Sequence, residues 1–141
     1  MRILIVEDEV RLAETLRDLL ELEHYTADIS HDGESGLDNA LSDIYDLVIL
    51  DVMLPDIDGF HICRKIREKH FYPVIMLTAK VESGDKIMGL TIGADDYITK
   101  PFNPLELVAR VKSQLRRYMQ LGSGIVQEKT TLKVGNIEMD D

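Results

Sequence analysis

The sequence predicts a three-layer α/β domain with a doubly wound, five-stranded parallel sheet. Two observations lead to this fold class. Short apolar runs of the kind that form buried strands alternate five times with segments whose apolar residues recur at helical spacing. Moreover, residues 47–50 and 74–77 show no polar alternation, which indicates strands covered on both faces by helices.

The predicted strands lie at residues 3–6, 25–29, 47–50, 74–77 and 97–99. Each predicted helix carries one apolar face: Leu12, Leu16, Leu19 and Leu20 in the first, Leu37, Ala40 and Leu41 in the second, Ile62, Cys63 and Ile66 in the third, and Leu107, Val108, Val111 and Leu115 in the last. A weaker helix is predicted over about 85–92. The last helix opens at Pro104, which suits a first helical turn.

Length and charge restrict the possible functions. The 141 residues suffice for one well-cored domain and a short appendage. The formal net charge of −10 argues against nucleic acid binding by this chain itself, because phosphate backbones are bound through clustered Lys and Arg. No apolar run approaches the roughly 20 residues that cross a bilayer, and the start is no signal peptide. A single cysteine, Cys63, cannot form an internal disulfide, so we expect a cytoplasmic protein.

The chain divides into three segments. Residues 1–118 form the predicted domain, and residues 119–130 form a linker in which Gly122-Ser123-Gly124 reads as a flexible joint. Residues 131–141 alternate like two strand fragments around a Gly-Asn turn. This last segment is too short for a core of its own.

Acidic residues follow two of the predicted strands. Glu7, Asp8 and Glu9 come after the first strand, and Asp51 comes after the third. In doubly wound sheets ligands bind beyond the carboxyl ends of the strands, so these carboxylates converge if the two strands are neighbours. Converging carboxylates repel one another unless a cation lies among them. Mg²⁺ suits a site of few carboxylates, water and phosphate, and Mn²⁺ is a possible substitute.

Two further polar residues end strands at the same edge. Thr78 ends the fourth strand and Lys100 follows the fifth. Taken singly, an Asp after a strand is usually a helix cap, and a Thr there bonds to nearby backbone. Taken together, these side chains match a phosphoryl-transfer site in which Asp51 is the nucleophile and the hydroxyl and ammonium groups bind the phosphoryl oxygens.

Four motifs carry a family resemblance. They are Ile5-Val6-Glu7-Asp8-Glu9; Leu50-Asp51-Val52-Met53-Leu54-Pro55 with Gly59; Leu77-Thr78-Ala79; and Gly93-Ala94-Asp95-Asp96-Tyr97-Ile98-Thr99-Lys100-Pro101-Phe102. In this order they resemble the receiver domain of two-component response regulators, over residues 1 to about 118. The resemblance implies a CheY-like (flavodoxin-like) fold with strand order 2-1-3-4-5.

The resemblance also implies roles for individual residues. Asp51 would accept a phosphoryl group from the phosphohistidine of a sensor histidine kinase, and the chain would be a signalling phosphoacceptor rather than an enzyme. Asp8, Asp51 and the Met53 backbone carbonyl would bind Mg²⁺ directly, and Glu7 would do so through water. Lys100 would pair with the phosphoryl oxygens, Thr78 would turn toward them, and Tyr97 would rotate inward. Lys100-Pro101 is the expected cis peptide, and Met53 and Lys80 are expected to tune autodephosphorylation.

The last predicted helix and the residues before it resemble the OmpR/PhoB subfamily of transcription factors. Active receivers of that subfamily dimerise through the fourth helix, fifth strand and fifth helix, so the resemblance implies a homodimer. The charges that match are Lys86, Asp95, Asp96, Glu106, Arg110 and Arg117, with Lys86 pairing with Glu106 and Asp96 with Arg110 across the two-fold axis. Residues 131–141 resemble the start of a winged-helix effector domain. DNA binding is therefore expected only through a domain that this truncated sequence lacks.

Three alternatives follow from the same residues. A Mg²⁺-dependent aspartyl-phosphate phosphatase of the haloacid-dehalogenase type needs an acid two positions after Asp51, where this chain has Met53. A flavodoxin-like cofactor binder needs a phosphate loop where this chain has Glu7-Asp8-Glu9. A degenerate receiver that acts only as an interaction module would lack Asp51, Thr78 or Lys100.

Other residues have ordinary structural interpretations. The four histidines, His24, His31, His61 and His70, show no metal-ligand spacing and are expected on the surface or on helix faces. Cys63, Met76 and Met88 are expected in the core. Asp56 and Asp58 are expected in the loop and cap of the third helix.

Overall fold

The structure is a computed structural model that describes residues 1–79 and 93–128, with side chains up to residue 120. Several sequence predictions lie outside the described residues: the helix over about 85–92, the side chains of Lys80, Lys86 and Met88, and the strand fragments of 131–141.

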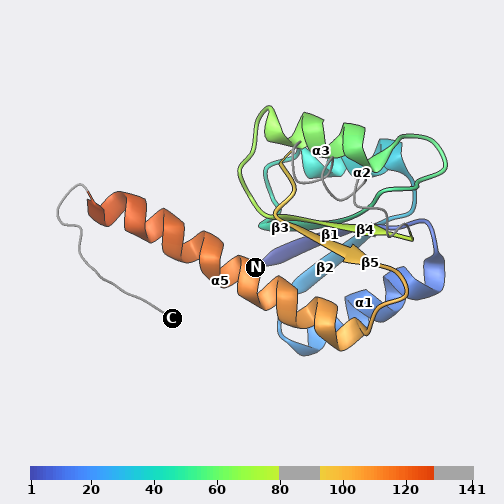
Figure 1. The fold of residues 1–141 in the computed structure, drawn as a ribbon, viewed down its shortest axis with the longest axis horizontal. Helices are drawn as coiled ribbons and strands as arrows, with labels where there is room; N and C mark the ends of the chain where they lie inside the picture. The colour runs from blue at the N-terminus through green and yellow to red at the C-terminus, as the bar shows by residue number, and fades with distance from the viewer. Residues whose placement is uncertain (80–92, 129–141) are drawn as a thin grey trace.

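The sheet has five parallel strands in the order β2-β1-β3-β4-β5, as predicted (Figure 1). The strands are β1 (Arg2–Val6), β2 (Thr26–Ser30), β3 (Leu47–Asp51), β4 (Val74–Thr78) and β5 (Asp96–Thr99). β1 lies between β2 and β3, so the chain reverses its direction of travel across the sheet there. This reversal opens a crevice at the carboxyl ends of β1 and β3.

Helices cover both faces of the sheet. α1 (Val10–Leu22) and α5 (Pro104–Glu128) lie on one face, and α2 (Gly33–Ala40) and α3 (Gly59–Arg67) lie on the other (Figure 1). The three-layer α/β fold predicted from the alternation of strands and helices is therefore confirmed.

The core is split by the sheet into two clusters. Alternate residues of a strand point to opposite faces, so Leu4 and Val48 pack under α2 and α3, whereas Ile3 and Ile49 pack under α1 and α5. All five β3 residues are buried. This two-sided burial is the reason why the β3 sequence lacks polar alternation.

Aspartates begin two of the helices. Asp32 accepts a hydrogen bond from Ser35 N (2.8 Å) at α2, and Asp58 accepts one from Phe60 N (2.7 Å) at α3. Each satisfies a backbone N–H that has no partner within its helix. The predicted cap of the third helix is confirmed for Asp58.

α5 continues further than the sequence predicts. The helix runs to Glu128 and includes Gly122-Ser123-Gly124, the predicted flexible joint, and its last turns project beyond the sheet (Figure 1). Each added helical residue gains a backbone hydrogen bond, whereas each of the two glycines costs about 1 kcal/mol relative to alanine. The joint prediction is therefore wrong for local structure, while the division of the chain at residue 118 stays a prediction.

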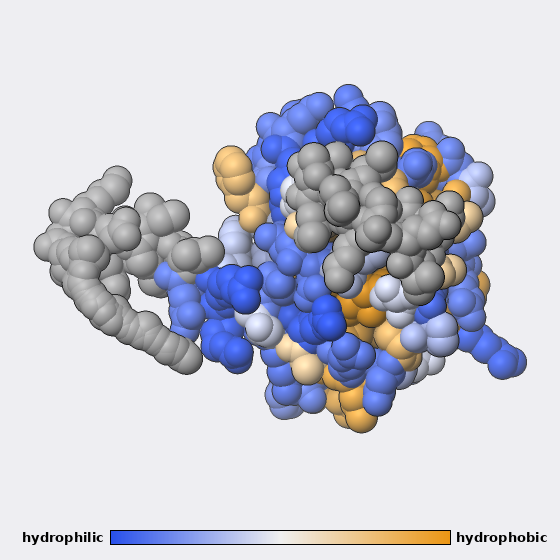
Figure 2. All heavy atoms as spheres, in the orientation of Figure 1, coloured by the Kyte–Doolittle hydropathy of each residue, from blue (hydrophilic) through white to orange (hydrophobic). Residues whose placement is uncertain are grey.

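The surface in view is mainly hydrophilic, and the apolar side chains that reach it lie in separate areas (Figure 2). This distribution agrees with the formal net charge of −10. Among the described residues, no helix combines the length and the apolar composition needed to span a membrane.

Candidate functional site

The carboxylates predicted to converge do so at the crevice between β1 and β3. Val6 pairs with Leu50 in the parallel register, so the residues that follow them, Glu7 and Asp51, emerge side by side. One carboxylate oxygen from each of Glu7, Asp8 and Asp51 lies within 4.8 Å of the other two. Glu7 and Asp51 are buried, with 0% and 3% of their surface exposed, whereas Asp8 is exposed.

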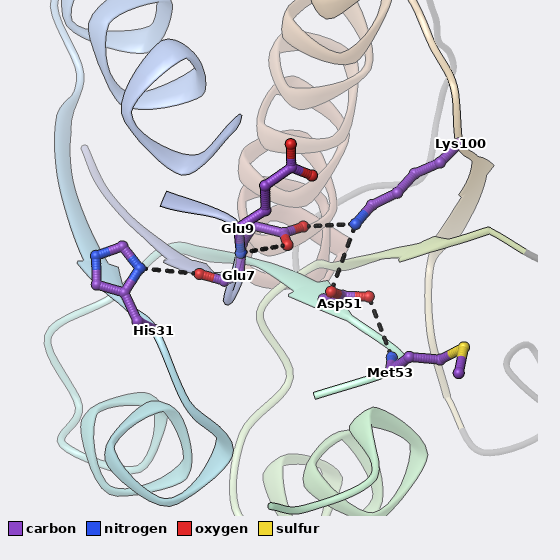
Figure 3. Close-up of polar contacts among 6 residues, drawn as sticks. All are labelled: Glu7, Glu9, His31, Asp51, Met53 and Lys100. Atoms are coloured by element: carbon purple, nitrogen blue, oxygen red, sulfur yellow. Dashed lines mark hydrogen bonds and ion pairs between the residues drawn. The ribbon is translucent and has the colours of Figure 1, made fainter. Parts of the chain in front are cut away.

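Lys100 reaches into this cluster from the end of β5. Its Nζ donates to Glu7 Oε1 at 2.9 Å and to Asp51 Oδ2 at 3.4 Å (Figure 3). The second Glu7 oxygen accepts from the Glu9 backbone N–H at 3.0 Å. One ammonium thus faces two buried carboxylates, which leaves the cluster with excess negative charge.

This arrangement shifts the pKa values of all three groups. Burial raises the pKa of the Glu7 carboxyl to about 7, even though the hydrogen bond from Lys100 opposes the rise. Burial also raises the pKa of Asp51, against the attraction of Lys100. The pKa of Lys100 lies above its ordinary value, because its partners Glu7 and Asp51 outweigh the burial that would lower it. Desolvated anions of this kind are stabilised by a further cation.

The loop between β3 and α3 is closed by backbone contacts. Met53 N donates to Asp51 Oδ1 (3.1 Å), Gly59 N donates to Val52 O (2.8 Å), and Met53 forms an antiparallel bridge with Asp58. Gly59 is required where α3 begins, because a Cβ there would lie 2.7 Å from Val52 Cα and still closer to the Asp51 carbonyl oxygen. The Met53 side chain is 58% exposed.

The predicted hydroxyl and aromatic residues lie on the neighbouring strands. Thr78 ends β4 and is fully buried, and its carbonyl accepts from Lys100 N at 2.6 Å. Asp51 pairs with Leu77, so Thr78 is the next residue toward the crevice. Tyr97 is buried, 7% exposed, in the cluster under α2 and α3, and its predicted inward rotation stays a prediction. The Lys100-Pro101 peptide is cis, as predicted.

The donor set fits a hard divalent cation. Glu7, Asp8 and Asp51 supply carboxylate oxygens only, and the ammonium group of Lys100 is shared between Glu7 and Asp51. Oxygen ligands of this type suit Mg²⁺ and Mn²⁺ rather than softer ions.

Sequence reasoning missed two polar contacts beside this site. His31 is exposed, as expected, but its Nδ1 atom also lies 3.1 Å from the Glu7 carbonyl oxygen (Figure 3). Asp56 lies in the loop before α3, as predicted, but it accepts from Gly33 N and Glu34 N at the start of α2, at 2.7 and 2.9 Å. Both contacts join residues more than 20 positions apart, and no local sequence signal encodes them.

Four of the charges predicted for a dimer interface, Asp95, Asp96, Glu106 and Arg110, form ion pairs within the chain. Arg110 donates to Asp96 (2.7 Å) and to Glu106 (3.0 Å), and Arg67 donates to Asp95 (2.6 Å). Arg117 is exposed. Arg110 lies one helical turn from Glu106 and faces β5, so an intrachain pair forms without a partner molecule.

Comparison with known families gives a direct match. A family model described as the response regulator receiver domain matches residues 3–112. The chain belongs to this family. The predicted fold and family of the receiver domain are thereby confirmed, and the phosphatase and cofactor-binding alternatives are not favoured.

Two curated relatives are similar to this receiver domain. The regulatory protein VanRc of Enterococcus gallinarum is 53% identical over 119 residues, which are 84% of this chain and 52% of VanRc. The response regulator ArlR of Staphylococcus aureus is 51% identical over 137 residues, 94% of this chain and 63% of ArlR. The receiver chain thus spans between half and two thirds of these relatives.

Among solved structures, response regulator DrrB of Thermotoga maritima, described as an OmpR/PhoB homolog, matches with a TM-score of 0.76 and 37% identity. The match covers 83% of this chain and 53% of DrrB. It agrees with the subfamily predicted for the receiver from its last helix.

Proposed function

We propose that this chain is a phosphorylation-activated receiver of the OmpR/PhoB type in which Asp51 accepts a phosphoryl group from the phosphohistidine of a sensor histidine kinase. The single observation that carries this proposal is the buried Asp51 carboxylate within reach of both Lys100 and the Glu7–Asp8 acidic pair. Each of these groups matches one requirement of phosphoryl transfer: a nucleophile, a positive donor and a cation-binding set.

In the proposed reaction an Asp51 oxygen attacks the phosphorus atom. The new O–P bond forms as the P–N bond to the kinase imidazole breaks, and the imidazole nitrogen keeps the bonding electron pair. The product on Asp51 is an acyl phosphate. Lys100 and the Thr78 hydroxyl would bind the phosphoryl oxygens, whose negative charge grows during transfer.

A divalent cation, Mg²⁺ or Mn²⁺, would be held by Asp8, Asp51 and the Met53 backbone carbonyl, with Glu7 reaching it through water. It would neutralise the carboxylates and the phosphoryl oxygens that Lys100 alone leaves unbalanced. The chain remains a signalling phosphoacceptor, because Met53 stands where a phosphatase would place a second acid.

Partners are part of the same proposal. A pocket of about 360 Å³ opens beside the site between the start of α1 and the loop after β5, lined by Glu9, Leu12, Ala79, Lys100, Pro101 and Phe102. We assign it to the approach of the kinase, in the cytoplasm. Phosphorylation would then favour a homodimer through the face of the fourth helix, β5 and α5. DNA binding would belong to a domain that follows the receiver.

Phosphorylation is tested by incubating the chain with acetyl phosphate and Mg²⁺ and measuring intact mass. We expect the mass increase of one phosphoryl group in the wild type and in the control Asp38→Asn, whose side chain is exposed on α2. Asp51→Asn should remain unmodified. Equal modification of Asp51→Asn would remove Asp51 from its proposed role.

The dimer is tested by light scattering with and without beryllofluoride, which mimics the phosphoryl group. We expect the activated wild type to double in mass, and Arg117→Glu to remain monomeric while still binding beryllofluoride. An activated wild type that stays monomeric at high concentration would contradict the dimer, without affecting the role of Asp51.

A further inference from the structure

Three loops surround the carboxylate cluster, and one side chain ties two of them together. Asp56 lies in the loop between β3 and α3, and its two carboxylate oxygens accept from successive backbone N–H groups of α2, Gly33 N at 2.7 Å and Glu34 N at 2.9 Å. Its partners are 23 and 22 positions away in the sequence. The contact therefore crosses between loops and is not a local turn.

The backbone at this crossing is closely packed. A Cβ on Gly33 would lie 2.8 Å from Ile57 Cβ and 2.9 Å from Asp56 Oδ1, so only glycine permits this approach. The hydrogen bond from Gly33 holds the pKa of the Asp56 carboxyl below its ordinary value, which keeps the group ionised. An ionised carboxylate at a helix N-terminus bonds to otherwise unpaired N–H groups and interacts favourably with the helix dipole.

A second contact connects the loop before α2 to the Glu7–Asp8 acidic pair. His31, two positions before Gly33, has its Nδ1 atom 3.1 Å from the Glu7 carbonyl oxygen. Two contacts thus connect the loops after β1, β2 and β3. His31 contacts Glu7, and Asp56 accepts a hydrogen bond from Gly33. On the other side, the bridge between Met53 and Asp58 closes the loop that contains Asp56.

We propose that Asp56 is a positioning residue for the cation site, because its contact with the start of α2 holds the β3–α3 loop and hence the Met53 carbonyl in place. This inference rests on the proposed function, since it assumes that Met53 and Asp51 bind a divalent cation. Asp56 itself is not a ligand. It acts by keeping the loop in the conformation that the cation requires.

The expected change in Mg²⁺ affinity is estimated from other groups that hold metal ligands in place. Groups that orient metal ligands typically change metal affinity 10–100-fold when they are removed. Asp56 is exposed and supports a single backbone ligand, so we expect the lower end, about tenfold weaker Mg²⁺ binding in Asp56→Ala.

A simpler role must be separated from this one, because Asp56 could serve only to cap α2. The chain offers a matched control. Asp32 caps the same helix by accepting from Ser35 N at 2.8 Å, but it belongs to the loop before α2, and among the described residues it accepts no hydrogen bond from the β3–α3 loop. Asp32→Ala removes the same charge and a cap of the same helix.

The experiment titrates the wild type, Asp56→Ala and Asp32→Ala with MgCl₂ and follows backbone amide shifts by NMR at a temperature where each is folded. We expect a melting temperature lowered in both variants and Mg²⁺ affinity reduced about tenfold only in Asp56→Ala. In the metal-free protein, hydrogen exchange at the Gly33 and Glu34 amides should accelerate in Asp56→Ala.

Equal Mg²⁺ affinities for Asp56→Ala and Asp32→Ala would overturn the positioning role. If Asp56→Ala does not fold, Asp56→Asn against Asp32→Asn decides by the same criterion, because asparagine keeps one acceptor oxygen. Absence of Mg²⁺ binding to the wild type would contradict the proposed cation site, which separates failure of the function from failure of this inference.

Discussion

Substitution of Gly59 by alanine tests how closely α3 approaches the phosphoacceptor strand. Gly59 is the first residue of α3, and its N–H donates to the Val52 carbonyl at 2.8 Å. A Cβ at this position would lie 2.7 Å from Val52 Cα and 3.0 Å from the Asp51 carbonyl carbon. Both neighbours are backbone atoms, so no side-chain rotation relieves the contact.

These contacts make the alanine variant less stable than the wild type. Overpacking of this kind destabilises the folded protein by about 1–3 kcal/mol. The higher helix propensity of alanine offsets up to about 1 kcal/mol of this loss. We therefore expect the free energy of unfolding to fall by about 1–2 kcal/mol, which lowers the melting temperature by roughly 4–8 °C for a domain of this size. Because the displaced atoms adjoin Asp51, Mg²⁺ affinity should fall as well.

The assay is thermal and urea unfolding followed by circular dichroism, combined with MgCl₂ titration of the folded proteins. His61→Ala is the matched control, because His61 is exposed two positions further along α3. We expect its melting temperature to stay close to that of the wild type. A Gly59→Ala protein as stable as His61→Ala, with wild-type Mg²⁺ affinity, would refute the close-approach reasoning.

Three further predictions concern buried groups. Burial raises the pKa of Cys63 to about 11, which lowers the fraction of reactive thiolate. A thiol reagent at pH 8 should therefore react about a hundredfold more slowly with folded protein than with protein in urea. Equal rates would contradict this prediction. Tyr72→Phe removes the 2.7 Å hydrogen bond from the Tyr72 hydroxyl to the Ala40 carbonyl, and it should lower the free energy of unfolding by about 1–3 kcal/mol. An unchanged midpoint of urea unfolding would refute this prediction. Burial and a hydrogen bond to Asp28 raise the pKa of Tyr45 to about 12. Its contribution to stability, measured against Tyr45→Phe, should therefore be complete below pH 10 and be lost as pH rises to 12, whereas a constant difference would contradict the shift.

Much of the candidate site could be predicted from the sequence because strand ends are local features. The apolar run that makes β3 ends at Asp51, and the run that makes β1 ends just before Glu7. Parallel strands present their carboxyl ends at one edge, so position along the chain placed these groups at that edge. The strand order that makes β1 and β3 neighbours was implied by the family resemblance. The motifs shared with receiver domains, and not the strand ends alone, identified Asp51 as the phosphoacceptor.

Contacts between loops could not be predicted in this way. Asp56 lies in the loop before α3, as expected, but its hydrogen bonds to the start of α2 had no signal in the sequence. Asp96 and Arg110 pair within the chain at 2.7 Å, a geometry that depends on how α5 packs beside β5. Neither contact has a local pattern, because each depends on the placement of two elements that are far apart in sequence.

The sequence by itself determined the strands, the buried faces of the helices and the set of acidic residues at one edge of the sheet, because hydrophobic periodicity and strand ends are encoded within a few residues. Only the tertiary structure decided the pKa values and the orientation of the site. Burial raises the pKa of Glu7 to about 7, Lys100 stands between two carboxylates, and Asp56 ties two loops together. Desolvation and long-range hydrogen bonds exist only once the layers have packed.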